Sequence, residues 1–163
     1  MRPDLLMLGL CLAGSTAFAQ LSPPNPDWKE ADAPPPPALR QSGLIGVEVQ
    51  RSSLKFGVDP DSISVGDDGI VRYVVVARSD SGAVTGLYEG IRCNTADFKV
   101  YARHNAGAWV PTRQIEWRPL QGNQAARHSL AIAQAGVCAG NSPNRSQAQI
   151  VKDLRAPVDT RFN

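Results

Sequence analysis

The densest group of side chains that could do chemistry is the stretch YEGIRC, residues 88–93. Side chains alternate along a strand, so Tyr88 and Arg92 would lie on one face of it. Glu89 would then lie on the opposite face, the one that also carries the apolar and sulfur side chains of the stretch. The four residues that we single out as binding or register-fixing candidates are Tyr88, Glu89, Arg92 and Arg72.

A glutamate among core side chains requires a partner, because an unpaired buried carboxylate is costly. The preceding strand offers Arg72 or Arg78 for this purpose. One interpretation is a carboxylate that faces a ligand; the other is a buried salt bridge that sets the strand register. We favour the salt bridge, because buried charges are nearly always paired.

A hydrolase or carbohydrate-active enzyme could use Glu89 together with Asp97 or Asp68 as a pair of carboxylates. No spacing in the sequence places such a pair, and no nucleophile elbow of the form GxSxG occurs. A glycine-rich phosphate loop is also missing from the sequence. We therefore predict no catalytic residues, no cofactor and a protein that is not an enzyme.

Metal binding has little support in the sequence. The two histidines, His104 and His128, have no partner at metal-ligand spacing, and we expect both to be surface residues. His104 falls at a predicted hairpin tip, and His128 lies off the apolar stripe of a predicted helix. The acidic stretch 66–69 (GDDG) lacks the alternating acids and distal Glu of a calcium loop, so we interpret it as a β-turn.

The N-terminus has the pattern of a secretion signal. An apolar run over residues 5–13 precedes Ala17-Phe18-Ala19, the small-x-small pattern of a cleavage site, and the run is too short to span a bilayer. We predict a signal peptide over 1–19. We expect Cys11 to leave with it, because Leu10 stands where a lipid-attachment site needs a small residue.

The rest of the chain has the size of one domain and no later segment apolar enough to cross a membrane. About 144 of the 163 residues remain after Ala19, enough for one core. The net charge of +2 is too small to indicate nucleic-acid binding. Two cysteines, Cys93 and Cys138, remain in an exported chain, and we expect them to form a disulfide.

Composition divides the mature chain into a linker, a domain and a tail. Seven prolines make residues 20–42 a stiff linker that favours polyproline II, although its Trp28 could dock on the domain or contact a partner. Residues 43–157 form the domain, and 158–163 a flexible tail. The linker could instead be a ligand for a proline-binding groove or a spacer from the membrane.

Strand patterns cover the first part of the domain. The expected strands are 44–49, 62–65, 70–78, 87–93, 98–103 and 108–110, and the valine run of 70–78 predicts a central strand. In 98–103 the alternation predicts that Phe98, Val100 and Ala102 face the core while Lys99 and Tyr101 face outward.

Helical spacing follows toward the C-terminus. Residues 125–137 carry one apolar stripe, formed by Ala126, Leu130, Ala133 and Val137. Residues 146–155 form a short second helix, with Asn144 and Gln147 as a capping pair. The fold class is therefore α+β: an antiparallel sheet with two C-terminal helices packed on one face. The disulfide would tie the end of the first helix to the end of a strand.

Two long stretches resemble a known family. The stretch VDPDSISVGDDGIVRYV (58–74) and YEGIRC (88–93), followed by Trp109, Trp117 and Cys138, resemble the cryptic neisserial protein-like family of exported Gram-negative proteins. The resemblance covers about residues 28–155. The family carries no established activity, so the resemblance implies a compartment and a fold rather than a function.

The order strand, Cys, strand, hairpin, Trp, helix, Cys is similar to that of the surface-adhesin protein E family, whose members bind host matrix proteins. We expect an exported, non-enzymatic envelope protein that lies in the periplasm, or is associated with the outer membrane or cell surface, and binds an unknown envelope protein or surface ligand. A matrix-binding surface adhesin is the first alternative, and the hydrolase is the second.

Overall fold

The computed structural model describes residues 26–113, 116–122 and 124–156. The predicted signal peptide (1–19) and C-terminal tail (158–163) lie outside them. The elements in chain order are β1 (Ile45–Val47), β2 (Lys55–Val58), η1 (Pro60–Ser62), β3 (Ser64–Val65), β4 (Ile70–Arg78), β5 (Val84–Arg92), β6 (Asp97–Asn105), β7 (Ala108–Pro111), β8 (Arg118–Pro119), η2 (Gln124–Ala126), α1 (Arg127–Ile132), η3 (Ala133–Val137), β9 (Cys138–Ala139), β10 (Ser142–Pro143) and α2 (Gln147–Arg155).

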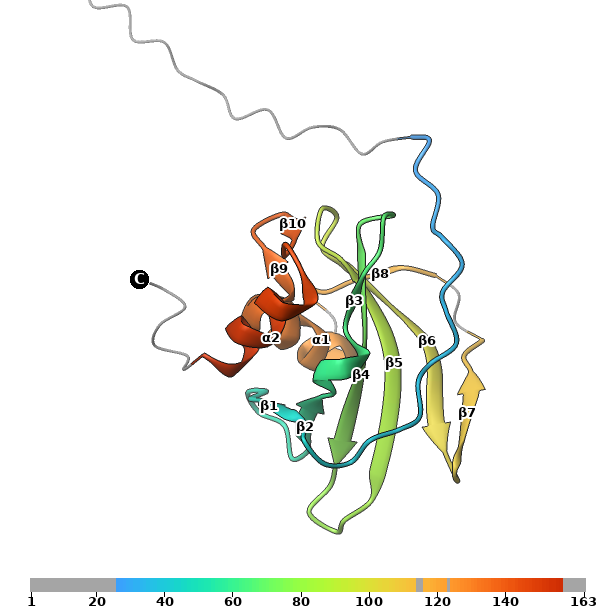
Figure 1. The fold of residues 1–163 in the computed structure, drawn as a ribbon. Helices are drawn as coiled ribbons and strands as arrows, with labels where there is room; N and C mark the ends of the chain where they lie inside the picture. The colour runs from blue at the N-terminus through green and yellow to red at the C-terminus, as the bar shows by residue number, and fades with distance from the viewer. Residues whose placement is uncertain (1–25, 114–115, 123, 157–163) are drawn as a thin grey trace, which may run out of the picture.

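An antiparallel sheet with two C-terminal helices is the architecture, as predicted (Figure 1). Its strands lie in the order β1-β2-β4-β5-β6-β7, with β3 added to β4 and β8 added to β6. The valine-rich β4 is central and buried over its first eight residues, because both of its faces are covered. The strand prediction for 70–78 is therefore confirmed residue by residue.

A β-bulge in β6 changes which side chains reach which face. Tyr88 pairs with Ala102, whereas the next residue, Glu89, pairs with Val100, so Tyr101 is the extra residue. Phe98 and Val100 face the helix side as predicted, but Ala102 is buried in the other cluster. The prediction for Ala102 is wrong because strict alternation does not survive a bulge.

The first helical segment bends along its length. It begins as the 3-10 turn η2, continues as α1 and ends as the π-helix η3, where Gly136 has φ 152°. At Gly136 a Cβ would stand 2.7 Å from the Cβ of Asp153 in α2, so only glycine allows this close approach. The stripe residues Ala126, Ala133 and Val137 are buried, as the spacing predicts.

The second helix begins within one residue of the expected start but has a different N-cap. Ser146 is the N-cap of α2, and its side chain accepts a hydrogen bond from the Gln149 amide. The expected cap, Asn144, is buried and donates through Nδ2 to the Gly136 carbonyl at 2.8 Å and to Asp153 at 2.7 Å. Asn144 therefore joins the end of η3 to α2 instead of starting α2.

The cysteine pair forms the expected disulfide. Cys93 directly follows β5, and Cys138 directly follows η3. The bond ties the end of a central strand to the end of the first helical segment, as the sequence predicts. Buried side chains of both helices, Ile132, Ile150 and Leu154, belong to the same cluster as Val71, Val75 and Ile91 of the sheet.

The described part of the expected linker, residues 26–42, is a strap that packs on the sheet rather than a free spacer. It passes along the sheet on the side away from the first helix (Figure 1). Ala33 and Leu39 contact a second apolar cluster formed by Val74, Val76 and Tyr88. A Cβ at Gly86 would stand 2.5 Å from the Leu39 side chain, so this glycine makes room for the strap.

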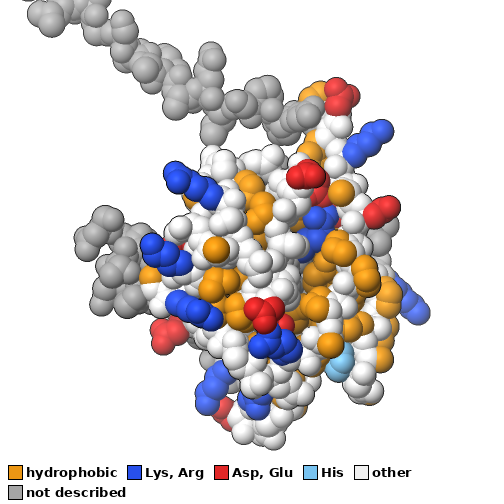
Figure 2. All heavy atoms as spheres, in the orientation of Figure 1, with side chains coloured by type: hydrophobic (Ala, Val, Ile, Leu, Met, Phe, Trp, Pro, Cys, Tyr) orange, Lys and Arg blue, Asp and Glu red, His pale blue; other side chains and the backbone are white. Residues whose placement is uncertain are grey.

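Acidic and basic side chains are interspersed over the face seen in Figure 2, with apolar side chains exposed between them. Among the described residues, no helix has both the length and the apolar character that crossing a membrane requires.

Candidate functional site

Glu89 lies at the centre of a closed polar cluster on the helix side of the sheet. It is 0% exposed and stands opposite Tyr73 in the β4–β5 register. Its Oε2 accepts hydrogen bonds from the Tyr73 hydroxyl at 3.0 Å and the Ser129 hydroxyl at 2.9 Å. Its Oε1 lies 2.8 Å from Nε2 of His128. The carboxylate is thus satisfied by β4 and by the start of α1.

The expected salt bridge between Glu89 and Arg72 does not form. Arg72 is opposite Gly90 and not opposite Glu89, so its side chain leaves the sheet on the other face. Arg78 lies at the far end of β4, opposite Val84. The residue that faces Glu89 is Tyr73, which the sequence analysis did not select.

His128 is not the surface residue that its position off the stripe predicts. It is 8% exposed, and its ring stacks on Phe56 with centroids 5.0 Å apart. The prediction fails because β2 places Phe56 beside α1, and Phe56 covers a side of the helix away from its apolar stripe. The other histidine, His104, lies near the β6–β7 tip and packs edge-on against Trp109 at 5.2 Å.

The electrostatics of the cluster favour an ionised Glu89. Burial acts to raise the pKa of Glu89, but the charge of His128 and the hydrogen bonds from His128, Ser129 and Tyr73 outweigh it and lower the pKa. Burial and the neighbouring Glu89 raise the pKa of Tyr73 well above its ordinary value. Glu89 is therefore a fixed anionic acceptor and Tyr73 a fixed donor.

This cluster has the residue types of a serine hydrolase but not the connectivity. In a Ser-His-acid relay, the hydroxyl and the carboxylate bond to opposite nitrogens of the imidazole. Here the same atom, His128 Nε2, faces both Glu89 at 2.8 Å and Ser129 Oγ at 3.3 Å. Ser129 donates its proton to Glu89, so His128 cannot act as its general base in this arrangement.

Arg92 occupies the opposite face, between two tryptophans. Its guanidinium carbon lies 4.5 Å from the ring centroid of Trp28 in the strap and 5.1 Å from that of Trp117. The same guanidinium donates to Asp97 at 2.8 Å and to Thr95 at 2.6 Å. Trp28 thus docks on the domain, and Arg92 is used in holding it there.

Arg72 and Asp68 form a second anchor for the strap. They pair at 2.7 Å with side chains only 4% and 3% exposed. Arg72 also donates to the Ala31 carbonyl at 3.1 Å, while the Asp68 carbonyl accepts from Trp28 Nε1 at 2.8 Å. Burial opposes ionisation of Asp68, but hydrogen bonds from Arg72 and two backbone amides lower its pKa.

The acidic stretch 66–69 is the predicted turn, closed by a bond from the Gly69 amide to the Gly66 carbonyl at 2.9 Å. Asp68 there faces Arg72 and the strap. Among the residues that the structure describes, no three His, Cys, Asp or Glu side chains are placed to hold a metal ion.

Glu30 of the strap completes this set of contacts. It pairs with Lys99 at 2.9 Å and accepts from Trp117 Nε1 at 3.0 Å. The Lys99 ammonium also lies over the Tyr101 ring, 5.3 Å from its centroid. Tyr88 is 3% exposed and packs against Tyr101 at 5.4 Å. Lys99 and Tyr101 face outward from the sheet as predicted, but the strap covers them.

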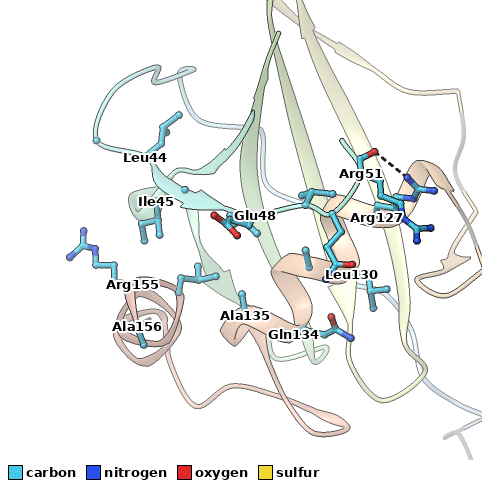
Figure 3. A pocket seen from close by; sticks show the side chains of 17 residues that line it. Leu44, Ile45, Glu48, Arg51, Arg127, Leu130, Gln134, Ala135, Arg155 and Ala156 are labelled. Carbon is cyan, nitrogen blue, oxygen red and sulfur yellow. Dashed lines mark hydrogen bonds between the residues drawn. The ribbon is translucent and has the colours of Figure 1, made fainter. Parts of the chain in front are cut away.

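An open groove lies at the other end of the sheet, between β1 and the helices (Figure 3). Its volume is about 1110 Å³. Apolar side chains line it from β1 and its flanks, from α1 and η3, and from the end of α2; they include Leu44, Ile45, Val47, Leu130, Ala135 and Leu154. Arg51, Arg127 and Arg155 also line it.

The structure separates the sequence candidates into two groups. Tyr88, Arg92 and Arg72 are brought together beneath the strap, whereas Glu89 lies on the helix side of the sheet. Sequence reasoning missed His128, Ser129 and Tyr73 as partners of Glu89, and it missed the groove. The only available signal was the even spacing of Tyr73 from Val71 and Val75, which placed it on the core face.

Comparison with known proteins agrees with the resemblance seen in the sequence. The model of the CNP1-like family matches residues 24–155. Cryptic neisserial protein 1 of Neisseria gonorrhoeae (strain ATCC 700825 / FA 1090) is 26% identical over 145 residues, a match that covers 76% of this chain and 70% of that protein. No solved structure matches the chain. The match spans the strap, the sheet and both helices, and the chain therefore belongs to the CNP1-like family.

Proposed function

We propose that this protein is an exported, non-enzymatic domain of the cell envelope that binds another envelope component through the groove beside β1. One observation carries the proposal. The polar side chains around the buried Glu89 bond to one another, while the groove stays open. An open, largely apolar hollow with a few charged groups is the usual form of a binding site.

The two faces of the sheet leave few other surfaces for binding. In this proposal, both C-terminal helices pack on one face, and the strap covers the other through Trp28, Glu30 and Leu39. A partner would then meet the domain at an edge of the sheet. The edge at β1 adjoins the open groove of about 1110 Å³.

The proposed compartment is the periplasm, with exposure at the cell surface as the alternative. The predicted signal peptide, residues 1–19, and the disulfide between Cys93 and Cys138 support export, because disulfides persist in oxidising compartments.

Protease shaving of intact cells, before and after permeabilisation of the outer membrane, tests this compartment. We expect the protein to resist protease in intact cells and to be lost after permeabilisation. Rapid loss from intact cells would favour the surface adhesin instead. Recovery of the uncleaved protein in the cytoplasmic fraction would refute export altogether.

Glu89→Gln tests the proposed absence of catalysis. A structural Glu89 predicts a less stable protein, whereas a hydrolytic one predicts a folded protein that has lost turnover. Screening of the wild-type protein against ester, peptide and glycoside substrates supplies the comparison. Turnover that Glu89→Gln abolishes, with an unchanged melting temperature, would contradict the proposal.

A further inference from the structure

We infer that the groove beside β1 binds an extended, acidic segment of another protein, which adds to the sheet as a strand along the outer edge of β1. This inference rests on the proposed binding function and gives it a ligand class. It follows from three features of the groove: a strand edge without a neighbour, an apolar lining, and arginines without ion-pair partners.

The first feature is the edge itself. β1 is the terminal strand of the sheet and pairs only with β2, through Ile45–Val58, Gly46–Gly57 and Val47–Phe56. Within the described residues, no other strand pairs with β1. The free side of an edge strand presents amide and carbonyl groups that an extended peptide can bond.

Gly46, the middle residue of β1, leaves open space on its own face of the strand. No heavy atom lies within 4 Å of the place where its Cβ would stand. Glycine within a strand commonly marks a point where another backbone comes close. A strand added beside β1 would therefore find room for its own side chain next to Gly46 on that face.

The second feature is the lining beyond the edge. Ile45 and Val47 of β1 pack toward the helix-side core, and Leu130, Ala135 and Leu154 line the groove from the helices. Side chains of an added strand would alternate between this apolar lining and solvent. The lining thus favours a segment whose residues alternate between apolar and polar types.

The third feature is charge. Arg51, Arg127 and Arg155 line the groove, and within the described part of the chain none of them forms an ion pair. Figure 3 shows Arg51 and Arg127 near one end and Arg155 near the other. Among the described residues that line the groove, Glu48 is the one acidic side chain. The surplus of positive charge at both ends complements a segment with acidic residues.

The strand edge is the reason to choose a peptide over an anionic lipid. Both ligands would use the apolar lining and the arginines, but a lipid tail cannot bond the backbone of β1. The two classes therefore differ in one measurable respect: only peptide binding requires free amides in the ligand.

The test is selection of a random heptapeptide display library on the immobilised, oxidised full mature chain. Arg51→Glu/Arg155→Glu is the groove variant. Arg103→Glu/Arg113→Glu, at exposed positions outside the groove, is the control with a matched charge change. We expect wild-type and control proteins to enrich acidic peptides that alternate apolar and polar residues. The groove variant should bind the best of them about ten-fold more weakly.

Synthetic copies of the best peptide, with alternate amides N-methylated in each of the two registers, test strand addition. We expect one register to lose binding and amide exchange at 45–47 to slow with the unmethylated peptide. Equal binding by both methylated forms would overturn the inference. So would selection that yields no acidic enrichment, or groove-dependent binding of phosphatidylglycerol vesicles in place of peptides.

Photo-crosslinking in cells separates failure of this inference from failure of the proposed function. A crosslinking residue at Gln134, which is exposed and lines the groove, is compared with one at Val110 on β7. Crosslinks to an envelope protein from position 134 alone support both proposals. If position 134 crosslinks to an envelope protein but the selection yields no acidic peptides, the proposed function stands and this inference fails. Crosslinks from position 110 alone refute the groove as the site, and both proposals fail with it.

Discussion

The two faces of the central sheet hold ionised side chains in different ways. On the helix side, Glu89 is fully buried and takes three hydrogen bonds from neutral or ionisable side chains. On the strap side, Arg92, Lys99 and Glu30 are 15–22% exposed and pair with opposite charges and with tryptophan rings. The first set is fully closed to solvent, whereas the second lies beneath the strap and keeps partial contact with solvent.

The difference shows what each face contributes. A buried carboxylate is tolerated only if its partners are all present, so the Glu89 cluster fixes the position of α1 against β4 and β5. The strap contacts of Arg92, Lys99 and Glu30 can be replaced by water one at a time, because these side chains are 15–22% exposed, whereas the Arg72–Asp68 pair beneath the strap is buried. We therefore expect the helix side to control global stability and the strap side to control local opening.

Removal of the disulfide should have the largest effect on the stability of the protein. Cys93→Ser/Cys138→Ser frees a loop of 45 residues. The free energy of unfolding should fall by about 4 kcal/mol, because the unfolded chain regains loop entropy. Urea denaturation of the mature protein measures this free energy of unfolding. The mature protein is prepared without the predicted signal peptide, so Cys11 is absent. Unchanged stability and folded yield would contradict a structural role for the bond.

Loss of the Glu89 charge should have the next largest effect. Glu89→Gln leaves one amide facing the donors of Tyr73, Ser129 and His128, so the free energy of unfolding should fall by about 2–3 kcal/mol. Glu48→Gln, at an exposed position, is the matched control and should change it by less than about 0.5 kcal/mol. Equal losses of stability at positions 48 and 89 would contradict the inference that the buried Glu89 cluster controls global stability.

Loss of Trp28 should have a smaller and more local effect. Trp28→Ala removes the ring over Arg92 and the hydrogen bond to the Asp68 carbonyl, so we expect a loss of about 1–2 kcal/mol. The strap should become sensitive to protease over 26–42 while the sheet stays protected from amide exchange. Lys29→Ala is the neighbouring exposed control. Loss of exchange protection throughout the sheet would show that the strap belongs to the global core.

The pH dependence should be the most gradual effect. The pKa values of Glu89, Asp68 and Glu30 are lowered in the folded protein despite burial, by hydrogen bonds and by nearby positive charge. Such groups stabilise the fold above their unfolded pKa values, and this stabilisation is lost as the pH falls through the folded values. Stability should therefore be flat above about pH 5 and should decline below about pH 4.5.

Comparison of two variants divides this pH dependence between the faces. Asp68→Asn/Glu30→Gln removes the strap-side carboxylates, and its decline in stability below pH 4.5 should be shallower than that of the wild type. Glu89→Gln removes the helix-side carboxylate and should flatten the curve separately. Thermal unfolding at a series of pH values supplies both curves. A steeper decline in either variant would contradict the assigned direction of the pKa shifts.

Local patterns in the sequence were sufficient for most of the elements, although they missed β2 (Lys55–Val58) and the two-residue strands β8, β9 and β10. The valines of 70–78, the turn at 66–69 and the apolar stripe at 126, 133 and 137 all lie where periodicity and turn chemistry place them. The antiparallel sheet with two helices was likewise predictable from short-range spacing. The disulfide was predictable from the number of cysteines left after the predicted signal peptide. The signal peptide and the compartment remain predictions.

Pairing between distant segments was not predictable from the sequence. The partner of Glu89 depends on the register between β4 and β5, the face of Ala102 depends on a bulge at Tyr101, and the burial of His128 depends on Phe56. A proline-rich segment has the same local conformation whether it is free or packed, so only its contacts identify the strap. The sequence alone thus determined the longer strands, the helices and the covalent bond between Cys93 and Cys138, because these follow from local periodicity and chemistry. The tertiary structure alone decided which charges are closed in and where the groove opens, because those depend on register and docking across the chain.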